Sequence, residues 1–265
     1  MPYPPRCPCS SVVEHRFGKA EVGSSILLAG TISKGKFDMS RVEQIGDCTL
    51  HLGDCMDVMP MLGRVDAVLT DPPYGIGEDG GQFRGRKGQG HRVLPKGGWD
   101  SETPPASVFN AILDISDEQI IWGGNYFADK LPVSKGWLYW QKLMGGDFAD
   151  GELAWTSRNK ALREFTLCNK MHGKEHPTQK PDSLMRWCLS LLPDAKTILD
   201  PFMGSGTTGV ACAKMGRHFI GIERHEPYFD IACRRIEAAY KQPDMFVASP
   251  TNDNRKPKPA DLFAA

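Results

Sequence analysis

Short apolar runs, each ended by a polar residue or a glycine, recur along the middle and carboxyl-terminal parts of the chain. Such runs are typical of strands buried on both faces of a parallel sheet. Apolar positions with helical spacing lie between several of them. Strands alternating with helices predict an α/β fold with a doubly wound, mostly parallel sheet. We expect strands at 48–52, 65–70, 120–122, 136–142, 152–156, 197–200 and 218–223, and helices at 182–192, 207–214 and 227–240.

The two ends of the chain lack this pattern. Residues 1–38 are rich in Pro, Ser, Gly and Lys, and residues 10–25 resemble the conceptual translation of a transfer-RNA gene. We therefore expect a non-native or disordered leader, with Met39 as the biological start. Residues 242–265 place prolines among polar residues, which predicts a disordered tail. One domain, residues 39–241, remains, and the 265-residue chain has room for one substantial core.

Composition and cysteine spacing argue against a zinc-binding protein, a membrane protein and a secreted protein. Lys plus Arg and Asp plus Glu both number 32, so only local clustering of charge can indicate a nucleic-acid partner. The eight cysteines show no zinc-ligand spacing, so we expect reduced thiols and no metal. No apolar run has the length of a membrane span or the character of a signal peptide. These features predict a cytoplasmic protein.

A glycine-rich turn follows the strand predicted at 197–200. Gly204, Gly206 and Gly209 allow close backbone approach to a nucleotide-like ligand, and the next strand ends at Glu223. Because Glu223 lies about twenty residues after Gly204, the three glycines and this acid also fit the dinucleotide fingerprint of dehydrogenases. Asp200-Pro201-Phe202 separates the strand from the first glycine, however. An acid there can attract the ammonium of a methionine moiety, for which NAD has no counterpart.

A second motif, Asp71-Pro72-Pro73-Tyr74, directly follows the strand predicted at 65–70. An amine conjugated to a base ring is a poor nucleophile. If the Asp71 carboxylate and the Pro72 carbonyl accepted its two N–H bonds, its lone pair would turn outward. The two prolines stiffen the turn, and Tyr74 offers a ring on which a flipped base can stack.

Together, and in this order, the two motifs resemble those of the β-type, permuted, S-adenosylmethionine-dependent DNA amino-methyltransferases. The resemblance covers about residues 45–240, and residues 122–127 and 148–150 are similar to small prophage-borne members. It implies a seven-stranded sheet and site-specific methylation of adenine N6 in duplex DNA. Asp rather than Ser at position 71 favours adenine N6 over cytosine N4.

The resemblance also assigns residues to roles. Asp71, Pro72, Pro73 and Tyr74 would form the catalytic turn. The string 176–181 would bring Thr178 and Lys180 near the cofactor carboxylate, and Asn125 and Phe127 would either line the base pocket or pack in the core. The remaining expected cofactor contacts are Asp54, Asp200, Phe202, Gly204, Gly206, Thr207 and Glu223.

Two basic segments are candidate DNA contacts. The glycine-rich stretch 75–98 is predicted to be a mobile loop, and 157–175 a short target-recognition segment. The rival interpretation of the leader is a basic arm that contacts DNA through Lys34, Lys36 and Arg41. We expect duplex DNA as partner, with a cognate restriction nuclease as a further candidate, and a monomer or homodimer. The candidate DNA contacts are Arg84, Arg86, Lys87, Arg92, Arg158 and Arg163.

Three alternatives stay open. Cytosine-N4 methylation uses the same architecture. Methylation of RNA or of a protein amide also uses a Pro-Pro-Tyr turn, but those families usually place the cofactor glycines first. A non-catalytic DNA-binding relic is the third alternative, against which the intact motifs argue.

Overall fold

The structure is a computed structural model that describes residues 41–77, 81–83, 92–94, 98, 100–143, 149–167 and 179–241. These residues belong to one compact unit, residues 39–265. The expected leader and tail lie outside the described residues. No helix in the described part of the chain is both long and apolar enough to span a membrane.

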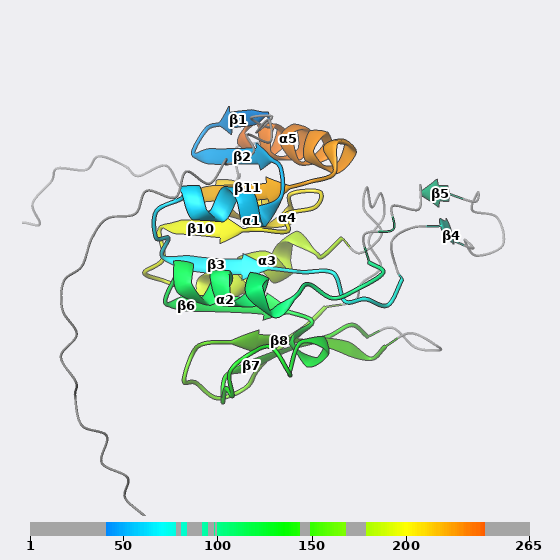
Figure 1. Cartoon of the computed structure of the whole chain (residues 1–265), viewed down its shortest axis with the longest axis vertical. Coiled ribbons are helices and arrows are strands. Elements are labelled where there is room, and N and C mark those ends of the chain that lie inside the picture. Colours follow the sequence, from blue (N-terminus) through cyan, green and yellow to red (C-terminus); the bar gives the residue numbers. More distant parts are fainter. Residues whose placement is uncertain are drawn as a thin grey trace, which may run out of the picture. The chain divides into compact units, whose positions relative to one another are not determined.

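A nine-stranded mixed sheet forms the centre of the described domain (Figure 1). Its five central strands, from β2 to β6, are parallel. Beyond β6, strand β8 is antiparallel, and β7 and β9 follow. In spatial order the strands are β1 (Val42–Ile45), β2 (Cys48–Leu52), β11 (His218–Glu223), β10 (Thr197–Asp200), β3 (Ala67–Thr70), β6 (Glu118–Trp122), β8 (Gly151–Thr156), β7 (Trp137–Gln141) and β9 (Arg163–Thr166).

The prediction of seven strands is wrong by two, because β1 and β9 extend the edges of the sheet. Strand β1 folds back on β2 through Gly46, whose φ is 55°, and β9 pairs in parallel with β7. Both strands are largely exposed, so they carry no apolar run. Edge strands bury few side chains, and a search for buried runs therefore misses them.

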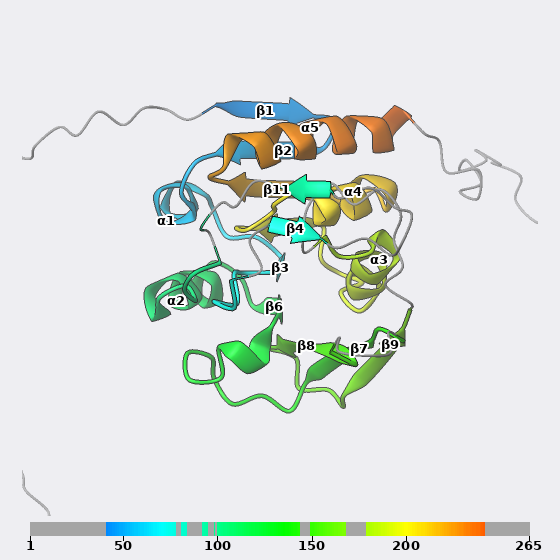
Figure 2. The same ribbon diagram turned by 90° about the vertical axis from the view of Figure 1, so that its right-hand side faces the viewer.

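Helices cover both faces of the sheet, as predicted (Figures 1 and 2). Helices α1 (Cys55–Val58) and α2 (Ala106–Ile115) pack on one face, with the 3₁₀ turn η1 (Met59–Met61) after α1. Helices α3 (Asp182–Ser190), α4 (Thr207–Lys214) and α5 (Glu226–Lys241) pack on the other. Alternate residues of one strand serve the two cores: Val68 packs with α2, whereas Leu69 packs with α3 to α5.

Two local predictions need correction. Asp182 was a candidate N-cap, but Pro181 holds that position and Asp182 is the first helical residue. Its carboxylate accepts from Lys214 Nζ at 3.1 Å and pairs with Arg186 Nε at 3.2 Å. The stretch 75–98 is not all loop, because β4 (Gly81–Phe83) and β5 (Arg92–Leu94) pair as antiparallel strands.

Asp100 fixes the chain where this stretch begins. Its carboxylate accepts from Gly75 N at 2.8 Å, and its carbonyl accepts from Gly77 N at 2.9 Å. Both glycines have positive φ, 71° and 74°, which other residues seldom adopt. The segment that follows the Asp-Pro-Pro-Tyr turn therefore begins from a defined position.

Candidate active site

The carboxyl ends of β2, β11, β10 and β3 lie at the same edge of the sheet, the edge at which open α/β sheets bind ligands. A cavity of about 630 Å³ opens there. Segments that follow all four strands line it, including Asp54, Asp71, Asp200 and Glu223. One cavity thus joins the two motifs found in the sequence.

The glycine turn after β10 needs glycine for two reasons. Gly204 and Gly206 have φ values of 51° and 77°, and a Cβ on Gly206 would lie 2.8 Å from Ala232 Cβ. Gly206 is also the N-cap of α4 and supplies no capping side chain. The first N–H groups of α4 are therefore free of side-chain capping at this position, as in helix ends that bind anions or polar ligands.

Glu223, at the end of β11, is held by backbone donors. Its Oε2 accepts from Gly204 N at 3.0 Å, and its Oε1 accepts from His225 N at 2.7 Å. Burial raises the pKa of Glu223, and these backbone hydrogen bonds oppose the rise. Each carboxylate oxygen can accept a second hydrogen bond. The group therefore suits a ligand with two neighbouring hydroxyls, such as a ribose.

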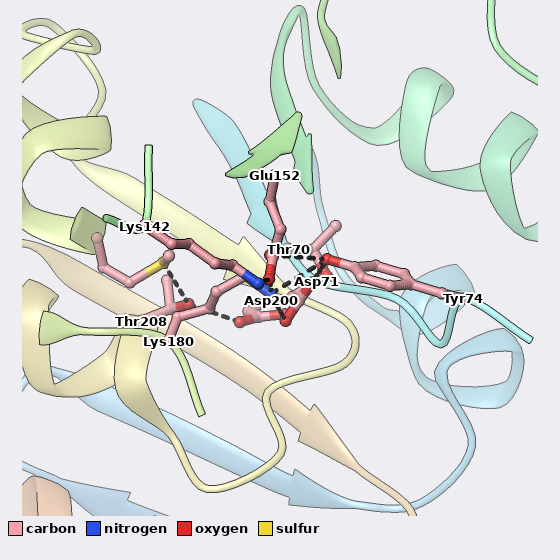
Figure 3. Close-up of polar contacts among 9 residues, drawn as sticks. Thr70, Asp71, Tyr74, Lys142, Glu152, Lys180, Asp200 and Thr208 are labelled. Atoms are coloured by element: carbon pink, nitrogen blue, oxygen red, sulfur yellow. Dashed lines mark hydrogen bonds and ion pairs between the residues drawn. The ribbon is translucent and has the colours of Figure 1, made fainter. Parts of the chain in front are cut away.

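Asp200 is more deeply buried than the sequence indicated. Its Oδ1 accepts from Thr70 Oγ1 at 2.8 Å, and its Oδ2 accepts from Thr208 Oγ1 at 2.7 Å (Figure 3). Its Oδ1 also accepts from Phe202 N at 3.1 Å. Burial raises the pKa of Asp200 to about 7. Asp200 therefore joins β3, β10 and α4, and near neutral pH it is only partly ionised, which weakens its expected attraction for an ammonium group.

Most of the other expected cofactor residues also meet at the cavity. Asp54 caps α1 by accepting from Met56 N at 2.8 Å. Gly206 acts in the backbone turn and is not among the residues that line the cavity. Thr178 lies outside the described residues. Those lining the cavity are Asp54, Lys180, Asp200, Phe202, Gly204, Thr207 and Glu223.

A network of charged and polar groups surrounds Asp71 (Figure 3). Tyr74 Oη donates to Asp71 Oδ1 at 2.5 Å, and Lys180 Nζ donates to Asp71 Oδ2 at 2.5 Å. The same Nζ lies 3.1 Å from Tyr74 Oη and 3.0 Å from Glu152 Oε2. Lys142 pairs with the other oxygen of Glu152. In the free protein both Asp71 oxygens therefore already have donors.

Burial and the neighbouring charges act in opposite directions on the pKa values of this network. Although burial opposes its ionisation, Lys180 and Lys142 hold the pKa of Glu152 at about 2. Burial also opposes the charge on Lys180, but Asp71 and Glu152 raise its pKa above the usual value. The pKa of Asp71 is raised by burial, and Lys180 opposes that rise. Lys180 is thus a charged ammonium between two carboxyl groups, with only 6% of its side chain exposed.

The Tyr74 ring is fixed by its neighbours. It stacks on Tyr126, with centroids 4.8 Å apart and planes 13° from parallel, and meets the edge of Phe127. A Cβ on Gly123 would lie 2.1 Å from the Tyr74 ring, so glycine is required there. Phe127 is fully buried and packs on Phe109, which makes it a core residue, while Asn125 is exposed.

The groups that surround Asp71 are not those that the sequence predicted. Lys180 was expected near a cofactor carboxylate, but its ammonium binds Asp71 and Glu152. Sequence reasoning missed Glu152, Lys142 and Tyr126 as members of the site. The available signal was an acid at the start of the otherwise apolar run 152–156, close to the predicted catalytic strands.

The two candidate DNA contacts whose side chains lie within the described residues, Arg158 and Arg163, lie away from this edge. Arg158 follows the end of β8 and pairs with Glu118 at the start of β6, at 3.5 Å. Arg163 begins β9 and is aligned with Leu138 near the start of β7. Both arginines therefore lie near the amino ends of the parallel strands. One strand length, about 15 Å, separates these ends from the carboxyl ends that border the cavity. Their expected part in a target-recognition segment stays a prediction. Arg84, Arg86 and Lys87, and the side chain of Arg92, lie outside the described residues.

Fold and site together define a class: an α/β protein with a nucleotide-sized cavity beside a carboxylate–tyrosine turn. Residues 119–234 match the DNA methylase family N6_N4_Mtase, which covers both N6-adenine and N4-cytosine enzymes. Over these residues the match agrees with the resemblance to the DNA amino-methyltransferases found in the sequence. It begins after Asp71 and so does not include the Asp-Pro-Pro-Tyr turn.

Two curated relatives are similar to this chain. One is the type II methyltransferase M2.DpnII of Streptococcus pneumoniae, 34% identical over 155 residues, which are 57% of this chain and 53% of the relative. The other is M2.LlaDCHI of Lactococcus lactis subsp. cremoris, 34% identical over 152 residues, 56% of this chain and 52% of the relative. The chain thus spans about half the length of these relatives.

Among solved structures, the M1.HpyAVI–SAM complex aligns with a TM-score of 0.49 and 24% identity. The alignment covers 71% of this chain and 99% of that one.

Proposed function

We propose that this chain is a DNA amino-methyltransferase that transfers a methyl group from S-adenosylmethionine to adenine N6 at a specific site in duplex DNA. The observation that carries the proposal is the shared cavity. Asp71 and Pro73, from the turn suited to an amine, line the same space as Asp54, Gly204 and Glu223, from the segments suited to a nucleoside. Methyl donor and methyl acceptor must meet, and one cavity between the two motifs allows this.

The lining of the cavity fits the proposed cofactor. The free acceptor positions on Glu223 suit the two ribose hydroxyls, and Asp54 at the end of the neighbouring segment suits the adenine amine of the cofactor. Phe202 is half-buried at the cavity wall and offers an apolar face. Asp200 retains one acceptor position on Oδ2 beside its bond from Thr208. S-adenosylmethionine supplies a methyl group activated on a sulfonium.

On the acceptor side, the chain positions the amine. The Asp71 carboxylate and the Pro72 carbonyl accept its N–H bonds, and Tyr74 stacks on the flipped base. S-adenosylmethionine, when bound, would supply the methyl group to the outward-turned nitrogen lone pair and would be left as a neutral thioether. The nitrogen then loses one proton, for which the Asp71 carboxylate is the nearest acceptor. The rate depends mainly on the alignment of the reacting atoms.

Adenine is preferred over cytosine because Asp occupies position 71. Cytosine N4 remains the second candidate, since the matched family contains enzymes of both kinds. The permuted order of the motifs and the likeness to small prophage members belong to the same proposal. The similarity to type II methyltransferases favours a restriction–modification setting in a cytoplasm, with a cognate nuclease as a candidate partner.

The direct test is methyl transfer by the full chain. Unmethylated genomic DNA and methyl-labelled S-adenosylmethionine should yield labelled DNA, and the protein should bind S-adenosylmethionine but not NAD in calorimetry. Binding of NAD in place of S-adenosylmethionine would support the dehydrogenase-like alternative. Binding of S-adenosylmethionine without labelling of DNA, RNA or protein would support the relic.

A further inference from the structure

Lys180 is connected to three acceptors at once, and this is more than an ion pair needs. Its ammonium contacts Asp71 Oδ2 at 2.5 Å, Glu152 Oε2 at 3.0 Å and Tyr74 Oη at 3.1 Å. An ammonium has three N–H donors, so the three contacts use all of them. One of these contacts occupies the Asp71 oxygen that would accept a substrate amine. A substrate amine that binds this oxygen therefore lies directly beside the Lys180 ammonium, whether it displaces the Lys180 N–H or shares the oxygen with it.

Glu152 gives Lys180 a place to remain when that contact is broken. The second oxygen of Glu152 is held by Lys142, and the side chains of Glu152 and Lys142 are only 20% and 15% exposed. Lys180 therefore stays beside Asp71 in a buried site even when Asp71 Oδ2 takes another donor. The N–H that leaves Asp71 is then free and lies next to the incoming amine.

Resting on the function proposed above, we propose that Lys180 is a specificity residue for the target base. Held by Glu152, it gives up Asp71 to the base amine and donates to the ring nitrogen beside that amine. An acceptor and a donor 2.5 Å apart, Asp71 Oδ2 and Lys180 Nζ, complement an edge that carries an amine next to a ring-nitrogen acceptor.

This arrangement selects among bases by hydrogen-bond polarity. Adenine, with N6 and N1, and cytosine, with N4 and N3, present an amine beside an acceptor nitrogen. Thymine presents a carbonyl beside an N–H, and so does the O6–N1 edge of guanine. A carboxylate facing the carbonyl and an ammonium facing the N–H would both be unpaired, and unpaired buried groups discriminate strongly. Glu152 is then a positioning residue, because it acts only through Lys180.

The test changes one atom of the substrate. Once the methylated site is mapped, synthetic duplexes carry 1-deazaadenine at the target position, or 7-deazaadenine as the control that alters a different edge. With the wild-type chain, 1-deazaadenine should lower kcat/KM about 10- to 100-fold, as expected for loss of a hydrogen bond to a charged group. The control should stay near the value for adenine.

The same duplexes are then assayed with Lys180→Met. We expect the variant to lose kcat/KM on adenine and to be insensitive to the 1-deaza change, because the two changes remove the same contact. If wild type and Lys180→Met lose the same factor on 1-deazaadenine, the inference is overturned. The wild-type chain alone must distinguish 1-deazaadenine from 7-deazaadenine. The inference can therefore be overturned even if Lys180→Met does not fold.

A second variant separates positioning from structure through the pH profile. The groups facing Asp71 are Lys180, Glu152 and Tyr74, with Asp200 nearby and Lys142 behind Glu152. Lys180→Met removes the cation that lowers the pKa of Asp71, so the acid limb of kcat/KM should move to higher pH. Glu152→Gln removes an anion that raises this pKa, so the limb should move to lower pH. Movement of both in one direction, or of neither, contradicts the assigned roles.

Glu237→Gln is the matched control, since Glu237 forms an exposed pair with Lys241 at 3.6 Å on α5. It should retain the wild-type profile. If no DNA is methylated by wild type, the proposed function itself fails and takes this inference with it. If DNA is methylated but the losses of kcat/KM from 1-deazaadenine and from Lys180→Met are additive, the proposed function stands and only the role of Lys180 is wrong.

Discussion

The two halves of the cavity are built in different ways. On the cofactor side, Glu223 is fixed by backbone N–H groups within its own turn and the glycine turn, so the geometry is local. On the base side, Asp71 is held by Tyr74 of its own turn and also by Lys180, which is 109 positions away and is itself paired with Glu152 of β8. The comparison shows that the Glu223 position follows from short motifs, whereas the surroundings of Asp71 depend in addition on the packing of the sheet.

The largest expected effect comes from removing the centre of the base side. Asp71→Ala deletes the proposed amine acceptor and leaves Glu223 and the glycine turn untouched. Methyl transfer should fall at least about 100- to 1000-fold, the loss typical of a positioned polar group in an active site. The affinity for S-adenosylmethionine should change little. Transfer assays and calorimetry measure the two quantities, and equal loss of both would contradict the division between the halves.

Glu223→Ala makes the reciprocal change. It removes the group suited to two ribose hydroxyls and should weaken S-adenosylmethionine binding about 10- to 100-fold, as for one or two hydrogen bonds to a charged acceptor. At saturating cofactor, transfer should recover most of its rate. Glu237→Gln, on the exposed face of α5, is the control. If saturating cofactor restored nothing, Glu223 would have a role beyond binding.

The contrast between local and distant construction also explains what the sequence could predict. The apolar runs of β3, β10 and β11 were visible because both of their faces are buried, whereas the exposed edge strands β1 and β9 were not. Asp71, Asp200 and Glu223 were found because each ends a buried strand. Glu152 was not, because its neighbours depend on the register of β8 with β6 and β7, which no short motif encodes.

A smaller effect should follow from moving Tyr74 without touching its hydrogen bonds. Gly123 has a φ of 74°, and a Cβ there would lie 2.1 Å from the Tyr74 ring. Gly123→Ala should therefore displace the ring and lower transfer about 10-fold, since small misplacements in an active site cost this much or more. Gly216→Ala is matched, because Gly216 has a φ of 63° and no neighbouring atom within 4 Å.

Both glycine variants should lose stability from backbone strain, on the order of 1–3 kcal/mol. Only Gly123→Ala should lose transfer at temperatures where both remain folded. Thermal unfolding and initial rates provide the comparison. If Gly216→Ala loses as much activity as Gly123→Ala, the contact with Tyr74 is not the cause.

The smallest effect on methyl transfer is expected at Asp200, where the change concerns the dependence of stability on pH. The pKa of Asp200 is raised to about 7, against about 3.9 in an unfolded chain. The folded state thus binds the proton more tightly, so this stabilising contribution is complete below pH 4 and is lost as the pH rises through 7. Asp200→Asn should remove that slope, which is on the order of 2–4 kcal/mol.

Denaturant unfolding at pH 5, 6, 7 and 8 would measure the slope. Asp66→Asn is the control, because backbone N–H groups of Lys196 and Thr197 lower the pKa of Asp66. Its stabilising effect is present above the unfolded pKa and is lost only as the pH falls, so the variant should not alter the slope between pH 5 and 7. A wild-type slope that persists in Asp200→Asn would mean that another group titrates there.

The most direct test of the central claim is the identity of the methylated nucleoside. DNA labelled by the wild-type chain with methyl-labelled S-adenosylmethionine would be digested and analysed by mass spectrometry. We predict labelled N6-methyladenine. Labelled N4-methylcytosine would contradict the choice of base while leaving the two-sided cavity intact, and the absence of any labelled nucleoside would contradict the proposed function.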